Sequence, residues 1–240
     1  MKVPRETPRF FVDSPDGETV ELSAGETHHA LNVLRLTDGA EVEVFDGAGG
    51  SADGILHIRS RKKVDVHILR RRRATDRPEP LVELAFAVPK GKRLDWLLEK
   101  TTELSAARLQ PVIFERSVAK TAPSNRWRRT CIAAAKQCGN NFLPEIAEAK
   151  TLKNFLASTD ADIKILGHAG GKMGIPTVMK EWSSGKRIVI LIGPEGGLSG
   201  DETTAAGEGG FANISLGNLT LRIETAAITL LAAVNACCQE

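Results

Sequence analysis

The sequence lacks several features that would each indicate a particular class of protein. Its 240 residues contain no tyrosine and only 5% aromatic residues, so we do not expect a broad platform on which nucleic-acid bases stack. No apolar run approaches the ~20 residues of a membrane span, and the first ten residues, MKVPRETPRF, have no apolar core of a signal peptide. We therefore expect a cytoplasmic protein with no membrane partner.

Cysteine is also scarce and is not arranged for metal binding. Cys131, Cys138, Cys237 and Cys238 form no CxxC pair, and their spacing to the five histidines matches no zinc motif. We expect reduced thiols and no metal. The remaining composition, 42% apolar and 26% charged residues, is that of an ordinary globular protein.

Positive charge is concentrated in the middle of the chain, although the formal net charge is only +2. Residues 78–140 contain 11 basic and 6 acidic residues, and a run of four arginines occupies residues 70–73. This pattern favours an anionic partner, but such runs are equally often solvated faces.

Two regions with different patterns follow one another. Up to residue 73 the chain reads as short strands, with a hairpin signal over residues 40–58 and one helical segment over residues 26–36. A small β-barrel is the natural interpretation. The polar, proline-containing stretch after it predicts a linker over residues 74–78.

From residue 79 to 240 strands alternate with helices, which predicts an α/β domain with a mostly parallel sheet. Strands are expected over residues 81–89, 109–115, 163–169, 187–193 and 211–217, and helices over residues 94–104 and from Ser124, a candidate N-cap. The last helix, from Ala226 to Cys238, is apolar on nearly every side. It must be covered all round, either inside the domain or, as we favour, at a subunit interface.

Glycine loops follow three of the predicted strands. Ile188–Ile192 runs straight into Gly193–Gly197, and Ser199 with Glu202 has the spacing of a capping box. A phosphate cradle is excluded because no GK[ST] follows, Pro194 has no amide donor and Glu195 would repel a pyrophosphate. Because ligands bind beyond the carboxyl ends of strands, we expect a pocket for a ligand without phosphates; a tight strand-to-helix turn is the plain alternative.

The other two glycine loops are ILGHAGG (165–171) and SLGNLTLRIETAA (215–227). Arg222 and Glu224 stand where the final helix begins, so an ion pair between them is the structural alternative to a functional Arg222. Three glycine-bearing strand ends together predict one composite pocket.

These segments resemble a known family. LIGPEGGLSGDE (191–202) followed by LGNLTLRIETAA (216–227) is similar to the signature of the knotted SPOUT methyltransferases, in particular the RsmE family, which methylates N3 of a uridine in 16S ribosomal RNA. Further similar blocks occur in the same order: PRFFV (8–12), HHALNVLRL (28–36), KGKRLDWLLEKTTELS (90–105), ERSVAK (115–120) and RWRRTCIAAAKQC (126–138). The resemblance covers nearly the whole chain.

The resemblance implies a PUA-like RNA-binding β-barrel over residues 1–73 and a SPOUT domain with a trefoil knot over residues 79–240. It implies that S-adenosylmethionine is the cofactor, that 16S rRNA or the small ribosomal subunit is the partner, and that a homodimer forms through the final helix. The positions expected to bind the cofactor are Leu166, Gly167, His168, Ile192, Gly193, Gly196, Gly197, Leu216, Gly217, Leu219, Leu221 and Ala226.

For catalysis we expect Arg222 to stabilise negative charge on the uracil carbonyls, with Arg9 and Glu195 positioning the base or handling its proton. The residues expected to contact RNA are Arg9, His29, Arg35, Lys90, Lys92, Arg93, Arg116, Arg126 and Arg129, with help from the basic cluster over residues 59–73.

The chain departs from the family pattern at Asn140 and Asn141, where an arginine is usual, at Ser105, where glycine is usual, and at Thr220. Two alternatives stay open. A ribose 2′-O-methyltransferase would carry an asparagine-serine motif before the last helix, where LRIETAA stands. A catalytically silent RNA-binding protein of the same fold is the other.

Overall fold

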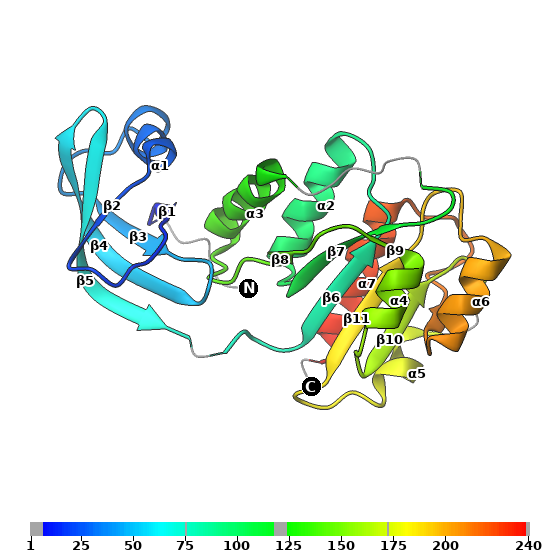
Figure 1. Cartoon of the computed structure of the whole chain (residues 1–240). Helices are drawn as coiled ribbons and strands as arrows, with labels where there is room; N and C mark the ends of the chain where they lie inside the picture. Colours follow the sequence, from blue (N-terminus) through cyan, green and yellow to red (C-terminus); the bar gives the residue numbers. More distant parts are fainter. Residues whose placement is uncertain (1–6, 75, 118–123, 172, 239–240) are drawn as a thin grey trace. The chain divides into compact units, whose positions relative to one another are not determined.

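The computed structural model describes residues 7–74, 76–117, 124–171 and 173–238 (Figure 1). The chain divides into two compact units. The first comprises Met1–Arg77 together with Ile132–Leu143, and the second comprises Pro78–Cys131 and Pro144–Glu240. Nothing in the sequence pattern indicated that Ile132–Leu143 would join the first unit.

The first unit is built on a five-stranded sheet with the order β1-β3-β4-β5-β2. Its strands are β1 (Arg9–Phe11), β2 (Thr19–Glu21), β3 (Glu41–Phe45), β4 (Gly50–Ser60) and β5 (Lys63–Arg73). β1 runs parallel to β3, and the other pairs are antiparallel. The predicted hairpin is the β3–β4 pair. β1 and β2 lie at the two ends of this strand order, in a unit made mainly of short strands, as the sequence predicted.

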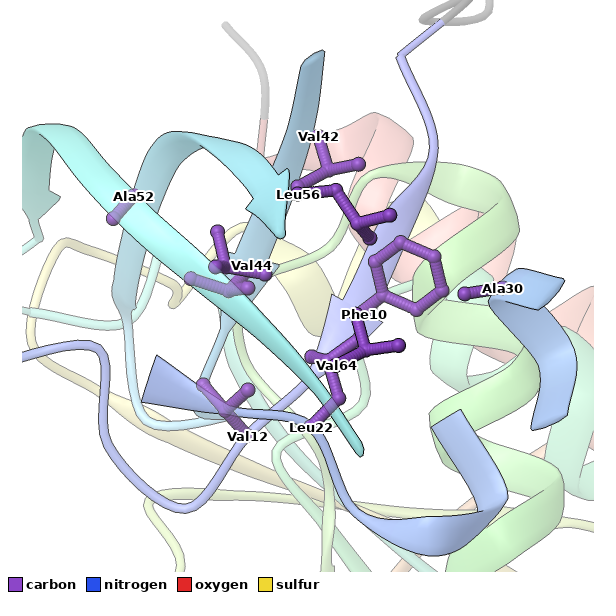
Figure 2. Close-up of a cluster of buried hydrophobic side chains, with 10 residues drawn as sticks. Phe10, Val12, Leu22, Ala30, Val42, Val44, Ala52, Leu56 and Val64 are labelled. Carbon is purple, nitrogen blue, oxygen red and sulfur yellow. The ribbon is translucent and has the colours of Figure 1, made fainter. Parts of the chain in front are cut away.

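Alternate residues of these strands point to one side and form the core of the unit. Figure 2 shows side chains of this core, from the strands (Phe10, Val42, Val44, Ala52, Leu56 and Val64), from the residues that follow β1 and β2 (Val12 and Leu22) and from a helical segment (Ala30). Side chains two residues apart on a strand share a face, which explains why alternate valines of β3 and β5 are buried together. Helix α1 (Ala24–His28) begins at Ser23, whose hydroxyl accepts a hydrogen bond from the Glu26 amide, and continues as a π-helix, η1 (His29–Val33).

Ile132–Leu143 contains the last part of helix α3 (Asn125–Cys138) and the turn after it. Lys136 Nζ donates to Glu26 Oε2 over 2.6 Å, and both side chains are largely buried. The backbone amide of Gly49 donates to the carbonyl of Asn141 over 3.0 Å. These bonds attach the segment to the strands and helix of the first unit.

The second unit contains a parallel sheet with the strand order β12-β10-β11-β6-β7-β8. Strand β9 also pairs with β7. Its strands are β6 (Leu81–Phe86), β7 (Arg108–Ile113), β8 (Glu145–Ile146), β9 (Lys150–Thr151), β10 (Ile163–Gly167), β11 (Arg187–Ile192) and β12 (Ala212–Ile214). All pairs within it are parallel, as the alternation of strands and helices predicted.

Helices cover both faces of this sheet (Figure 1). They are α2 (Lys92–Glu103), α4 (Leu152–Ser158), α5 (Ile175–Met179), α6 (Gly200–Glu208) and α7 (Ile223–Cys237). α7 packs on β6, β10 and β11 and contacts α2 and α5, while α4 contacts α6 and β7. In Figure 1, α7 lies behind the sheet and α4 in front of it. This two-sided cover explains the continuous apolar run of β11, which is buried from Ile188 to Ile192.

Helix α7 begins at Ile223, three residues before the predicted start, with Arg222 as its N-cap residue. One face, including Leu230, Leu231 and Val234, is buried within the unit. The other face is partly exposed at Ile228, Ala232 and Ala233. The helix is therefore covered on one side by its own chain.

Ser105, one of the departures from the family pattern, follows α2 and has a φ of 59°. This left-handed conformation is easily adopted by glycine and costs a residue with a Cβ atom some strain. A glycine at this position would therefore serve to end helix α2. Its replacement by Ser105 does not change a residue of the glycine loops.

Candidate functional site

Three neighbouring strands end at one edge of the second unit's sheet. In the register of the sheet Gly167, the last residue of β10, pairs with Ile192 of β11 on one side and Ile214 of β12 on the other. Because the three strands are parallel, the loops that follow them meet at this edge. The three glycine loops thus come together, as the sequence predicted.

These loops line one cavity. Its lining residues are Gly167, His168, Ala169, Ile192, Gly193, Pro194, Glu195, Gly197, Leu198, Ile214, Leu216, Gly217, Leu219, Thr220, Leu221, Ile223 and Ala226. Ten of the twelve positions predicted to bind a cofactor are among them. Leu166 and Gly196 are not: Leu166 is fully buried within the sheet, and a side chain on Gly196 would meet that of Arg116.

Four of the other lining residues, Ala169, Pro194, Thr220 and Ile223, lie within the three glycine loops that the sequence predicted to form one pocket. Leu198 and Ile214 lie just outside those loops and were not predicted.

Glycine is required in this cavity for reasons internal to the protein. A Cβ atom on Gly193 would lie 2.2 Å from Cδ1 of Leu198. Gly197 and Gly217 have φ angles of 71° and 114°, a backbone region that L side chains rarely adopt. The backbone conformation of Gly197 and Gly217 therefore accounts for glycine at these two positions, independently of any ligand.

The capping box predicted at Ser199 and Glu202 is present. The Ser199 hydroxyl accepts from the Glu202 amide over 3.3 Å, and Glu202 Oε2 accepts from the Ser199 amide over 2.9 Å. The second carboxylate oxygen, Oε1, accepts from the amide of Glu115 over 2.7 Å. One carboxylate therefore joins the start of α6, which follows the glycine loop, to the loop after β7.

Charged groups gather beside this cavity. Glu195 is paired with Arg93, and their side chains are 43% and 31% exposed. Arg222 is exposed at the start of α7 and lines a neighbouring cavity together with Arg93, Glu195, Thr220 and Leu221. Within the part of the chain that the structure describes, Arg222 forms no ion pair with Glu224. The structural alternative for Arg222 is therefore not supported.

Arg9 is the one predicted catalytic residue that lies elsewhere, in β1 of the first unit. It is only 5% exposed. Its guanidinium donates to the carbonyl of Ala135 over 2.6 Å and to the side chain of Asn141, lies 3.4 Å from Glu43, and stacks over Phe45. A side chain that is buried and engaged in this way is not available to RNA or to a reacting base, so the prediction for Arg9 is corrected to a structural role.

The remaining residues predicted to contact RNA are divided between the units. His29, which is half-buried, and Arg35, which is exposed, belong to the first unit. Burial, followed by the nearby Lys136, lowers the pKa of His29 below its ordinary value of 6.5, so its ring is neutral at pH 7. In the second unit Lys90, Lys92, Arg116, Arg126 and Arg129 are exposed and Arg93 is partly buried.

Besides Arg93, which is paired with Glu195, two of these arginines have partners within the second unit. Arg116 Nη1 donates to the Gly196 carbonyl over 3.0 Å, and Arg126 is paired with Asp95. Arg116 thus fixes the glycine loop in addition to presenting charge. Both side chains stay solvent-accessible enough to meet an anion.

Comparison with known proteins identifies the relationship. Residues 77–235 match the family described as "RNA methyltransferase domain", and residues 22–69 match the "RNA methyltransferase PUA domain". The ribosomal RNA small subunit methyltransferase E of Synechocystis is 30% identical over 227 residues, which cover 91% of this chain and 73% of that protein. The chain belongs to this methyltransferase E family.

Other members agree along the whole length. Methyltransferase E of Bacillus subtilis is 27% identical, with 95% of each chain covered. A solved structure of methyltransferase E from Neisseria gonorrhoeae, bound to S-adenosyl methionine, matches with a TM-score of 0.86, 28% identity and coverage of 97% of this chain and 98% of that chain. A methyltransferase from Legionella pneumophila with the cofactor SAM bound matches with a TM-score of 0.87, 28% identity and the same coverage. The PUA-like first unit and the parallel α/β second unit are those of the family.

Two further findings concern only the described residues. No helix among them is both long enough and apolar enough to cross a membrane. They also contain no group of three or more His, Cys, Asp or Glu side chains that could hold a metal ion.

Proposed function

We propose that this methyltransferase E uses S-adenosylmethionine to methylate N3 of a uridine in 16S ribosomal RNA of the small subunit. The observation that carries the proposal is the single cavity formed by the loops after β10, β11 and β12. Names of the relatives support RNA of the small subunit as the substrate, and the resemblance of residues 191–202 and 216–227 supports N3 of uridine.

The residues of the cavity fit this cofactor. Its lining contains no lysine or arginine, and apart from His168 the only ionisable side chain is Glu195. Apolar side chains such as Ile192, Leu221 and Ile223 suit the faces of an adenosine, and backbone groups of the glycine loops can hydrogen-bond its edges. A carboxylate at the rim is favourable for a cation. When bound, S-adenosylmethionine supplies a methyl group carried on a positively charged sulfur.

The protein's own groups then account for the rest of the chemistry. N3 of uracil must exchange a proton for the methyl group, so negative charge develops on the base. Arg222 lines the neighbouring cavity and has no carboxylate partner among the described residues, so it can stabilise that charge. Glu195 lines both cavities, which supports it as the acceptor of the N3 proton. Positioning of the two reactants supplies much of the remaining acceleration.

Basic residues of the second unit are proposed to hold the RNA backbone. The exposed candidates are Lys90, Lys92, Arg116, Arg126 and Arg129. If they contact phosphates, the logarithm of the RNA association constant should fall with the logarithm of salt by about 0.7 for each phosphate neutralised. A salt-independent affinity would contradict this assignment.

The family resemblance also leads us to propose a homodimer and a trefoil knot. The partly exposed face of α7, with Ile228, Ala232 and Ala233, carries small apolar side chains that allow two helices to approach closely. Ala232→Glu should convert the dimer to a monomer in sedimentation experiments. The strand order supports the knot, because β12 pairs on the far side of β10 from β11, and α7 then returns to pack on β6, β10 and β11. Tracing the chain from β10 to α7 in a crystal structure tests it.

Two measurements test the function. Calorimetric titration with S-adenosylmethionine should show binding to the purified chain, and absence of binding would favour the silent RNA-binding alternative. Mass spectrometry of small-subunit RNA after incubation should show one 3-methyluridine. A methyl group on a ribose 2′-hydroxyl would favour the alternative ribose methyltransferase.

A further inference from the structure

Two more cavities adjoin the one assigned to the cofactor. The first is lined by Arg93, Glu195, Thr220, Leu221 and Arg222. The second is lined by Ala87, Val88, Pro89, Lys90, Arg93, Ser117, Pro194, Glu195 and Ile223. Glu195 lines all three cavities, so it marks the point where they meet. An acceptor held in this region would lie against the cofactor cavity.

The region where the cavities meet combines a carboxylate with basic side chains, which is unusual for a surface that binds RNA. Arg93, from the first turn of α2, is paired with Glu195 of the loop after β11. Arg222, at the start of α7, lines the same cavity and makes no ion pair with the described residues. A phosphate would be repelled by Glu195, so a group that offers both hydrogen-bond acceptors and a donor fits better.

The Watson–Crick edge of uracil is such a group. It presents a carbonyl acceptor, the N3–H donor and a second carbonyl acceptor in sequence, whereas cytosine presents an unprotonated N3 and an amino group. We propose that Arg93, Glu195 and Arg222 together recognise this edge, with the carboxylate accepting from N3–H and the two guanidinium groups donating to the carbonyl oxygens. This inference rests on the proposed function and names the site of its acceptor base.

The pairing of Arg93 with Glu195 is then the state of the site before the base enters. Both side chains are partly exposed, so exchanging their mutual contact for contacts with a base requires little loss of burial. Val88, Pro89 and Ile223 of the adjoining cavity offer apolar surface to the face of the ring. RNA-binding proteins recognise splayed-out bases in this way, by hydrogen bonds to the edge and apolar contacts to the face.

The reaction product provides a test that does not depend on turnover. In 3-methyluridine the N3–H donor is replaced by a methyl group, which would face the carboxylate of Glu195. The wild-type protein should therefore bind unmethylated small-subunit RNA about 10- to 100-fold more tightly than the same RNA carrying 3-methyluridine, or cytidine, at the target position. Binding is measured by equilibrium filter retention without S-adenosylmethionine.

Amino-acid substitutions test which residues cause this difference in affinity between the RNAs. Glu195→Ala should bring the affinities for the three RNAs to within about threefold of one another, because the group that reads N3–H is gone. Arg93→Ala and Arg222→Ala should weaken binding of the uridine RNA about tenfold and the other two RNAs much less. The matched controls Glu208→Ala and Arg187→Ala, on exposed residues elsewhere in the second unit, should retain the wild-type ratios. Circular dichroism and thermal unfolding confirm that each variant keeps its fold.

Three results would overturn the inference: equal wild-type affinity for all three RNAs, an unchanged ratio in Glu195→Ala, or an equal loss of affinity for all three RNAs in the arginine variants. Each of these results would still be compatible with methylation of small-subunit RNA by the wild-type protein. By contrast, absence of 3-methyluridine from the wild-type reaction would reject the proposed function itself. The two failures are therefore distinguishable.

Discussion

Replacing Arg9 with methionine distinguishes a buried structural arginine from one that contacts RNA. The side chains of Arg9 and Glu43 are 3% and 1% exposed, so Arg9→Met leaves a buried carboxylate with less compensation. Removing one partner of a buried ion pair costs about 3–5 kcal/mol. Arg72 also lies 3.6 Å from Glu43 and remains in the variant, so we expect the lower end, about 3 kcal/mol.

The assay must report on the first unit alone. Trp96, Trp127 and Trp182 all lie in the second unit, so tryptophan fluorescence would not follow this change. Hydrogen exchange of the amides in β3 and β4 would, and a loss of about 3 kcal/mol corresponds to exchange that is about 150-fold faster. Arg187→Met, at an exposed arginine of the second unit, should leave the exchange of these strands unchanged.

The salt dependence of RNA binding tests the alternative, in which Arg9 contacts RNA. If Arg9 contacted a phosphate, Arg9→Met would reduce the slope of the log association constant against log salt by about 0.7. A structural Arg9 leaves the slope of the folded protein unchanged. Unaltered exchange combined with a lower slope would refute the structural assignment.

Further predictions follow from the second unit and from His29. Arg222→Ala should lower turnover about 100- to 1,000-fold with little change in the calorimetric affinity for S-adenosylmethionine, and an equal loss of both would reject its catalytic role. Ser199→Ala should destabilise the second unit by about 1 kcal/mol in urea unfolding, and Glu202→Ala by about 2 kcal/mol because its two carboxylate oxygens serve two amides; equal losses would mean that the bond to Glu115 contributes nothing. Because the pKa of His29 is lowered in the folded state, its contribution to stability is present above pH 6.5 and is lost as pH falls below that value. Hydrogen exchange of the first unit should show this loss in the wild type and not in His29→Gln; identical pH profiles would contradict it.

The features that could be predicted from the sequence are those that depend on neighbouring residues. The capping box of Ser199 and Glu202, the β3–β4 hairpin and the buried strand β11 follow from patterns within short stretches of sequence, and each is present. The convergence of the glycine loops was also predictable, because parallel strands necessarily end at one edge.

Long-range contacts could not be predicted in the same way. Arg9 resembles an RNA-binding residue in the sequence, but its partners include Ala135 and Asn141, more than 120 positions away. Asn141, counted as a departure from the family pattern, accepts the hydrogen bond of that arginine. Lys136 of α3 is likewise paired with Glu26, 110 positions earlier in the chain. No local pattern records such pairs.

The assignment of Ile132–Leu143 to the first unit means that the backbone passes between the units three times, after Arg77, after Cys131 and after Leu143. Cleaving the chain once, in the 74–78 segment, would therefore not liberate two independent pieces. A fragment that starts at Pro78 would contain Lys136 and Asn141 without their partners Glu26 and Arg9. The complementary fragment would lack the groups that accept hydrogen bonds from Arg9. Swapping PUA-like modules between members of this family would require exchanging two stretches of sequence together.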